Sequence, residues 1–240
     1  MYVGHFAIGM AMKSVSPKTP TLLIMLGVGF MDIINGLFVM AGVDRVAPNL
    51  NSGPYLYFDL TFIDWDHSLL MATVLSLLWA ALFWREGWVA WIAAFAVFSH
   101  FLADWPLHNH DLALYPYSGQ HLGYGLWAKL GTTSWLLEGA FSLALIGFAE
   151  WRNSPRGVSC KWAIIVLILL YLQMSPWLSP MKFVAQLSEP ATHLLHGALV
   201  TIGFLVPGLL LTWLINRGER LSSGACCLWT RPLAPRRHLL

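Results

Sequence analysis

The chain contains little charge for its length. Of its 240 residues only 14 are Lys or Arg and 12 are Asp or Glu, so 11% of the residues are charged and 57% are hydrophobic. A soluble domain carries about 25% charged residues, so this composition argues against a water-soluble fold and predicts an integral membrane protein. The formal net charge of +2 also argues against a nucleic-acid partner, because nucleic-acid-binding surfaces are strongly basic.

Cysteine is equally scarce, with three residues in the whole chain. Cys160, Cys226 and Cys227 fall in segments that we assign below to the cytoplasmic side, where disulfides are rare. A disulfide framework is therefore not expected. The N-terminus also lacks the basic region of a cleavable signal peptide, so we expect the first apolar segment to remain in the mature protein.

Long apolar runs, in contrast, are abundant. A transmembrane helix needs about 20 mostly apolar residues. This rule predicts an all-α, polytopic helical membrane protein with six long transmembrane helices and a short N-terminal membrane helix. The short helix is expected at residues 3–13, and the long ones at 20–41, 66–84, 87–105, 126–149, 161–179 and 191–215. We expect residues 1–216 to form one transmembrane domain and residues 217–240 a basic cytoplasmic tail.

The basic residues predict the orientation of these spans. Lys13, Lys18, Arg85, the basic residues of the 150–161 connection and those after the last span all fall on one side of the alternating topology. The positive-inside rule assigns that side to the cytoplasm. The chain is therefore predicted to be a multi-pass protein, surrounded by membrane lipids, with a cytoplasmic C-terminus.

Ionisable residues inside the predicted spans gather in the outer half of the membrane. Such residues are costly in lipid and are functional candidates by default. At about 1.5 Å rise per residue, Asp32 and His100 lie roughly 18 to 20 Å from the cytoplasmic ends of their spans. His67 opens the 66–84 span on the outer side, and His5 reaches a similar depth. Random placement would scatter these groups between the two leaflets.

The stretch SHFLADWPLHNHD, residues 99–111, concentrates these groups. His100 and Asp104 are spaced i, i+4 and project from one helix face, as a metal chelate requires, and His108 follows near the same end. Imidazole together with carboxylate suits zinc, manganese or iron better than calcium or magnesium. The pattern predicts one or two divalent ions, with zinc preferred. An interhelical polar network would use the same residues.

Four segments together resemble a known family. GHFAIGMAMK near the N-terminus, an Asp inside the second helix, DHSLL and SHFLADW are similar to bacterial inner-membrane proteins described as metal-dependent hydrolases. That family is distantly similar to zinc-dependent phospholipase C and to the single-strand-specific nucleases. The resemblance covers roughly residues 1–111. It implies a bacterial inner-membrane location and a phospholipase C-like activity.

The resemblance also implies roles for individual residues. Asp32, His67, His100 and Asp104 would hold one ion, and Asp104 would bridge to a second ion that also takes His5. His108 would begin a further site. The metal ligands predicted in this way are His5, Asp32, His67, His100, Asp104 and His108, and the predicted catalytic acids are Asp32, Asp104 and Glu138.

The chain departs from the family pattern at three places. FMDIIN replaces a Pro-Asp-x-Asp run, IDWDHS replaces a Gly-rich segment before the histidine, and the later His-x-x-x-Glu is absent. Glu138 with His193 or His196 would be its only substitutes. The other acids near the predicted site are interpreted as solvated loop residues or helix caps. They are Asp44, Asp64, Asp66 and Asp111.

Three functions remain open at this point. The first is a membrane-embedded metal-dependent hydrolase that acts on a phosphoester of a lipid or lipid-linked substrate. The second is a non-catalytic accessory or assembly subunit that binds partner membrane subunits and keeps a vestigial metal site, which the departures from the family pattern favour. The third is an ion or proton transporter. It is the weakest, because the spans show no inverted repeat and no matching acid lies near the cytoplasmic face to complete a path.

Overall fold

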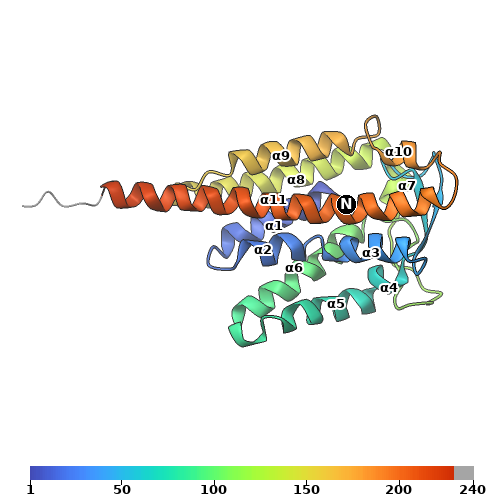
Figure 1. The fold of residues 1–240 in the computed structure, drawn as a ribbon, viewed down its shortest axis with the longest axis horizontal. Coiled ribbons are helices and arrows are strands. Elements are labelled where there is room, and N and C mark those ends of the chain that lie inside the picture. The colour runs from blue at the N-terminus through green and yellow to red at the C-terminus, as the bar shows by residue number, and fades with distance from the viewer. Residues whose placement is uncertain (230–240) are drawn as a thin grey trace, which may run out of the picture.

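The computed structural model describes residues 1–229, with side chains as far as Ser222. The chain forms a bundle of α-helices, and its irregular segments gather at one end (Figure 1). We call this end, which carries the β-hairpin described below, the hairpin end. The predicted tail cysteines, Cys226 and Cys227, lie outside the described side chains, and residues 230–240 lie outside the described chain.

The bundle is built from seven longer helices, and α11 runs along its whole length and extends beyond the end opposite the hairpin end (Figure 1). These helices are α1 (Val3–Val15), α2 (Thr21–Gly27), α3 (Phe30–Met40), α5 (Leu69–Ala81), α6 (Trp88–Asp104), α8 (Thr132–Asn153), α9 (Lys161–Gln173) and α11 (Ala191–Trp229), with α2 and α3 treated as one broken helix. Shorter turns complete the described fold: α4 (Asp64–His67), α7 (Leu126–Leu130), α10 (Met181–Val184) and the 3-10 turns Trp84–Glu86 and Ser154–Arg156. The main contacts join α11 to α3 and α2, α1 to α8, and α5 to α6.

Apolar side chains fill the centre of the bundle and also cover much of its outside. Phe6 and Ile24 are completely buried in the core. Leu78, Leu169 and Trp213 are more than half exposed on the outer helix faces. Exposed apolar surface of this kind is typical of proteins that contact a membrane.

The helix lengths differ from the prediction of six long spans, although the mostly helical fold confirms the all-α class. Among the described residues, Thr132–Arg156 and Ala191–Ser222 are long and apolar enough to cross a membrane, and α2 with α3 makes a third if the pair is one broken span. The apolar helices α5, α6 and α9 contain only 13, 17 and 13 residues. Local breaks shorten them, because Ser68 caps α5 and a glycine with positive φ, Gly87, precedes α6.

The loop expected after the first long span contains a β-hairpin. Strands β1 (Arg45–Pro48) and β2 (Phe58–Phe62) pair antiparallel, with Val46 opposite Leu60. Phe58 is completely buried and packs with Met181 of α10. The hairpin thereby covers the end of the bundle where the candidate site lies.

The predicted span 20–41 is broken at Val28 and Gly29, and α2 and α3 meet at an angle of 49°. Gly29 precedes α3 and packs against the ring of Phe204, where a Cβ atom would come within 2.9 Å of the ring. The first helical hydrogen bond of α3 runs from Ile33 N to the Gly29 carbonyl. The Val28 carbonyl is therefore left outside the hydrogen-bond ladder of α3.

Two glycines allow α3 and α11 to approach closely. A Cβ atom on Gly36 would overlap the carbonyl oxygen of Gly197, and a Cβ atom on Gly197 would overlap that of Gly36. Small residues at a helix contact are typical of helices that pack within membranes. This contact fixes α3, which carries Asp32, against α11.

The close contact predicts that Gly36→Ala destabilises the fold by about 1–3 kcal/mol, because the added methyl group has no room and the helices must separate. The matched control is Gly147→Ala in α8, where a Cβ atom would meet nothing within 4 Å. We expect this control to be neutral or stabilising, since Ala favours a helix more than Gly does. Thermal unfolding in detergent measures the difference. Equal melting temperatures for the two variants would contradict the close packing.

Candidate metal centre

Histidine and aspartate side chains from four elements converge near the hairpin end. His5 comes from α1, Asp32 from α3, His67 from α4, and His100 and Asp104 from α6. They form two groups of three whose ligand atoms lie within 4.8 Å of one another: His5, His100 and Asp104, and Asp32, His67 and His100. The structure thus brings together five of the six predicted ligands in groups that could hold a metal ion.

The distances between facing donor atoms fall in a narrow range. His100 Nε2 lies 3.0 Å from Asp104 Oδ2 and 3.4 Å from Asp32 Oδ2. His67 Nε2 lies 3.6 Å from Asp32 Oδ1, and His5 Nε2 lies 3.2 Å from Asp104 Oδ1. Ligands at 2.0–2.2 Å from a tetrahedral zinc ion are roughly 3.3 to 3.6 Å apart. The separations of 3.4 and 3.6 Å fall in this range and those of 3.0 and 3.2 Å are slightly shorter, so the facing atoms of each pair are close enough to bind the same small cation.

His108, the sixth predicted ligand, lies in the turn after α6 and faces the same carboxylate. Its Nε2 is 3.5 Å from Asp104 Oδ2. Asp104 thus presents Oδ2 to His100 and His108, and Oδ1 to His5. The backbone nitrogen of Met1 also contacts Asp104 Oδ1. A carboxylate with imidazoles on both oxygens has the arrangement of a bridging ligand.

Several of these atoms lack ordinary hydrogen-bond partners. Neither ring nitrogen of His5, nor Nε2 of His100, makes a hydrogen bond to a described residue, although both rings are completely buried. The two rings stack with centroids 3.7 Å apart. An unpaired buried polar atom costs about 1–3 kcal/mol. A divalent cation between the carboxylates and the Nε2 atoms of His5 and His100 would satisfy those two nitrogens, so the donor set fits a metal ion.

The break between α2 and α3 orients His100. Its Nδ1 donates a hydrogen bond to the Val28 carbonyl, 2.8 Å away. Because a carbonyl only accepts, the proton of the neutral ring is on Nδ1 and the lone pair of Nε2 is directed at Asp32 and Asp104. Metal-binding histidines usually have such a hydrogen bond on their other nitrogen.

Two acids hold the other histidines in the same way. His67 Nδ1 lies 2.9 Å from Asp66 Oδ1, and His108 Nδ1 lies 3.0 Å from Asp111 Oδ1. Asp66 is completely buried. It is therefore neither a solvated loop residue nor a helix cap, contrary to our interpretation, since the cap of α5 is Ser68, whose Oγ accepts from Met71 N.

The interpretation of Asp44 and Asp64 as solvated loop acids is also wrong, since both are buried. Asp64 accepts from the backbone N–H of Tyr117. Asp44 Oδ2 accepts from the amide of Asn35, 3.3 Å away, and its Oδ1, like Oδ2 of Asp66, is buried without a partner among the described residues. Burial raises the pKa of Asp44 to about 8, and the neighbouring Asp66 carboxyl adds to this rise. A proton on Asp44 would allow it to donate to the neighbouring Asp66 carboxyl, which in turn contacts His67.

Glu138, the third predicted catalytic acid, lies outside both groups of candidate ligands. Its Oε1 accepts from the backbone N–H groups of Tyr2 and Gly4, at 2.7 and 3.2 Å, and its Oε2 accepts from the Tyr55 hydroxyl. These contacts cap the first turn of α1. Glu138 therefore positions the helix that carries His5.

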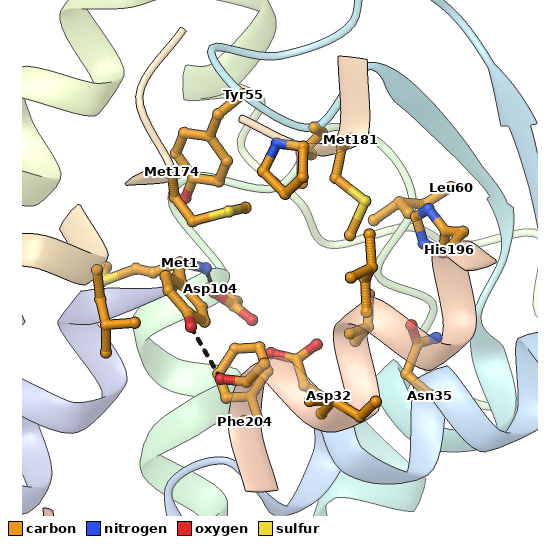
Figure 2. A pocket seen from close by; sticks show the side chains of 18 of the residues that line it. Met1, Asp32, Asn35, Tyr55, Leu60, Asp104, Met174, Met181, His196 and Phe204 are labelled. Carbon is orange, nitrogen blue, oxygen red and sulfur yellow. Dashed lines mark hydrogen bonds and ion pairs between the residues drawn. The ribbon is translucent and has the colours of Figure 1, made fainter. Parts of the chain in front are cut away.

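A cavity of about 290 Å³ opens beside the cluster. Figure 2 shows the carboxylates of Asp32 and Asp104 on one side of it, with His196 and Leu60 on the opposite side. Asp32 is the most accessible candidate ligand, with 18% of its side chain exposed. His193, in contrast, is on the surface and pairs with Glu189. Asp32 thus connects the candidate metal ligands to the cavity.

No family model, curated protein or solved structure matches this chain. The resemblance to bacterial inner-membrane hydrolases therefore stays a prediction. The chemistry of the cluster and the cavity beside it carries the functional argument.

The cluster predicts that the purified protein contains at least one equivalent of zinc, manganese or iron. His100→Ala and Asp104→Ala should lose this metal, because each removes a donor that faces at least two others. His193→Ala is the matched control, since it removes an exposed histidine and should retain the metal. Elemental mass spectrometry measures the content. No stoichiometric metal in the wild type, or full retention in both ligand variants, would contradict the assignment.

The raised pKa of Asp44 predicts a pH-dependent stability. Its pKa is about 8 in the folded chain and 3.8 ordinarily, so the folded state binds an extra proton between these values. The free energy of unfolding therefore decreases as the pH rises through this range. Asp44→Asn keeps a donor for Asp66 but does not titrate. From pH 5 to pH 9 the melting temperature of the wild type should fall more than that of Asp44→Asn.

The control for this experiment is Asp59→Asn, which changes an exposed acid on β2 and should keep the pH dependence of the wild type. Parallel curves for the wild type and Asp44→Asn would rule out a buried proton at Asp44. Metal content should be measured at both pH values, so that loss of metal is not mistaken for titration of Asp44.

Proposed function

We propose that the chain is a membrane-embedded, metal-dependent hydrolase that acts on a phosphoester of a lipid or lipid-linked substrate. The observation that carries this proposal is the convergence of imidazole and carboxylate donors at 3.0 to 3.6 Å beside a cavity. The apolar helices that are able to cross a membrane support a substrate drawn from the lipid phase.

The donor set suggests how the ions are divided. The Nε2 atom of an imidazole has one lone pair, so His100 serves one ion only. Asp32, His67, His100 and Asp104 Oδ2 would hold the first ion, with His108 beside them. His5 and Asp104 Oδ1 would hold a second ion, with the Asp104 carboxylate as the bridge. The first set has more donors and more supporting hydrogen bonds, so it is the stronger site. Zinc suits these donors best, and manganese and iron are the alternatives.

A bound divalent ion supplies Lewis acidity toward a phosphoryl oxygen and lowers the pKa of a water molecule toward neutrality. The residues of the chain provide the rest. Asp32 reaches the cavity and is placed to orient a water or accept its proton. Val28, Asp66 and Asp111 fix the rings of His100, His67 and His108. The apolar cavity wall excludes bulk water and strengthens the electrostatic interactions at the site.

The lining of the cavity favours an amphiphilic substrate. Most of the polar residues that line it belong to the metal cluster or lie nearer the hairpin end. The part that extends between α9 and α11 is lined mainly by apolar side chains, those of Leu170, Ile202 and Val206, and Gln173 is the polar residue there. A phosphate at the cluster would leave this apolar part for a hydrocarbon chain.

The proposed function predicts that the protein hydrolyses phospholipids. Zinc-loaded protein in mixed micelles should release diacylglycerol from phosphatidylglycerol or phosphatidic acid, whereas the soluble ester p-nitrophenyl phosphate should react poorly. Asp32→Asn should lower the lipid reaction by roughly a hundredfold or more, since even supporting residues at metal sites contribute 10- to 100-fold. His193→Ala should react like the wild type.

Two outcomes decide between the functions left open by the sequence. Lipid hydrolysis that requires metal and Asp32 supports the enzyme. Stoichiometric metal with no turnover of either lipid overturns it and favours an accessory subunit with a structural metal site.

A further inference from the structure

The side of the cavity opposite the metal cluster carries one buried histidine without a partner. His196, in the second turn of α11, is 3% exposed and lines the cavity. Its Nδ1 is buried and makes no hydrogen bond to any described residue. The ring of Phe58 packs edge-on against it, with centroids 4.4 Å apart. None of the interactions described above uses this imidazole.

The surroundings of His196 determine what the ring can offer to a ligand. A proton on Nδ1 would leave a buried N–H group without an acceptor, which costs more than an unused lone pair. The proton of the neutral ring is therefore on Nε2. Because His196 lines the cavity and Nδ1 is sealed against protein, Nε2–H is the donor available to a molecule in the cavity.

The contact between α3 and α11 sets the position of this donor relative to the cluster. Asn35 lies one turn beyond Asp32 on α3, about 4.5 Å along the helix axis. The neighbouring Gly36 packs directly against Gly197, the residue after His196. Along the helix axis, His196 is thus offset from Asp32 by about one turn toward the hairpin end, and it faces Asp32 across the cavity (Figure 2). An offset of one turn is comparable to the length of a small lipid head group and much shorter than a hydrocarbon chain.

The charged residues around the cavity restrict which chemical group of a ligand can bind next to His196. Among the described residues that line the cavity there is no Lys or Arg, and the amino group of Met1 is paired with Asp104 on the side of the metal cluster. A second phosphate would therefore lack a counter-charge there. Leu60, Met181 and Leu199 are also part of this wall, together with Asn35, whose amide group donates to Asp44. A mostly apolar wall with neutral polar groups suits an uncharged oxygen.

We infer that His196 binds the head group of the lipid substrate, donating from Nε2 to an uncharged oxygen, such as a hydroxyl, while the phosphoryl group lies at the metal cluster. The inference rests on the proposed function, because it assumes a lipid phosphoester in this cavity. The hydrocarbon chain of the lipid would occupy the apolar part of the cavity formed by Leu170, Ile202 and Val206. His196 is then a specificity residue that selects hydroxyl-bearing head groups.

Two lipid analogues that resist hydrolysis test this role without activity. They are the phosphonate analogues of phosphatidylglycerol and phosphatidylmethanol, in which a methylene replaces the ester oxygen on the diacylglycerol side. Both have the same charge, but only the first has head-group hydroxyls. Their dissociation constants for the zinc-loaded protein are measured in detergent by the change in tryptophan fluorescence, since Trp127 lines the cavity.

The wild type should bind the glycerol analogue about tenfold more tightly, as expected when a buried donor is otherwise left unpaired. His196→Leu should abolish this preference. His196→Gln, whose amide N–H is a donor of similar reach, should restore part of it. His193→Leu, on the exposed side of the same helix, should keep the full tenfold ratio.

Equal binding of the two analogues by the wild type, or a preference that survives in His196→Leu, would overturn the inference. In either case lipid hydrolysis by the wild type would leave the proposed function standing. If the tenfold preference depends on His196 but the protein hydrolyses neither phosphatidylglycerol nor phosphatidic acid, the result would support the head-group site and count against the enzyme. If neither analogue binds, both the head-group site and the lipid substrate are refuted.

Discussion

The candidate site depends on one hydrogen bond, from His100 Nδ1 to the Val28 carbonyl at 2.8 Å. The bond exists because the helix is interrupted between Gly27 and Phe30. In a continuous helix the Val28 carbonyl would accept from its own ladder. The interruption frees the carbonyl, fixes the protonated nitrogen of His100, and directs Nε2 toward two carboxylates. Gly29 permits this because Phe204 occupies the space that a side chain would need.

Burial of polar groups is the second constraint, and it explains why the helices that carry the site are short. α6 ends at Asp104, α4 ends at His67, and α3 begins two residues before Asp32. Ligands at helix ends can approach one another from different directions, whereas long parallel helices would hold them apart. Buried polar atoms are usually paired. Val28, Asp66 and Asp111 supply the outer partners of His100, His67 and His108, and a cation would supply the inner ones. Nδ1 of His5 has no partner among the described residues.

Periodicity and depth were sufficient to predict part of this arrangement. The i, i+4 spacing of His100 and Asp104 places both on one face, and the matched depth of Asp32 and His5 brings them to the same level. The break at Gly29 was not predictable in this way, because it depends on Phe204 from a distant helix. The supporting role of Asp66 depends on the orientation of the His67 ring, which no sequence spacing determines. The β-hairpin and the cavity contact of His196 arise from equally distant packing.

X-ray absorption at the metal K-edge tests the central claim most directly, since it reports the atoms bound to the ion in the intact protein. The account predicts nitrogen and oxygen ligands at about 2.0–2.2 Å, with the outer-shell scattering of at least two imidazole rings. A sulfur shell at about 2.3 Å would assign the metal to cysteine, outside the cluster described here. A shell of oxygen alone, without imidazole scattering, would likewise contradict a centre built on His67 and His100.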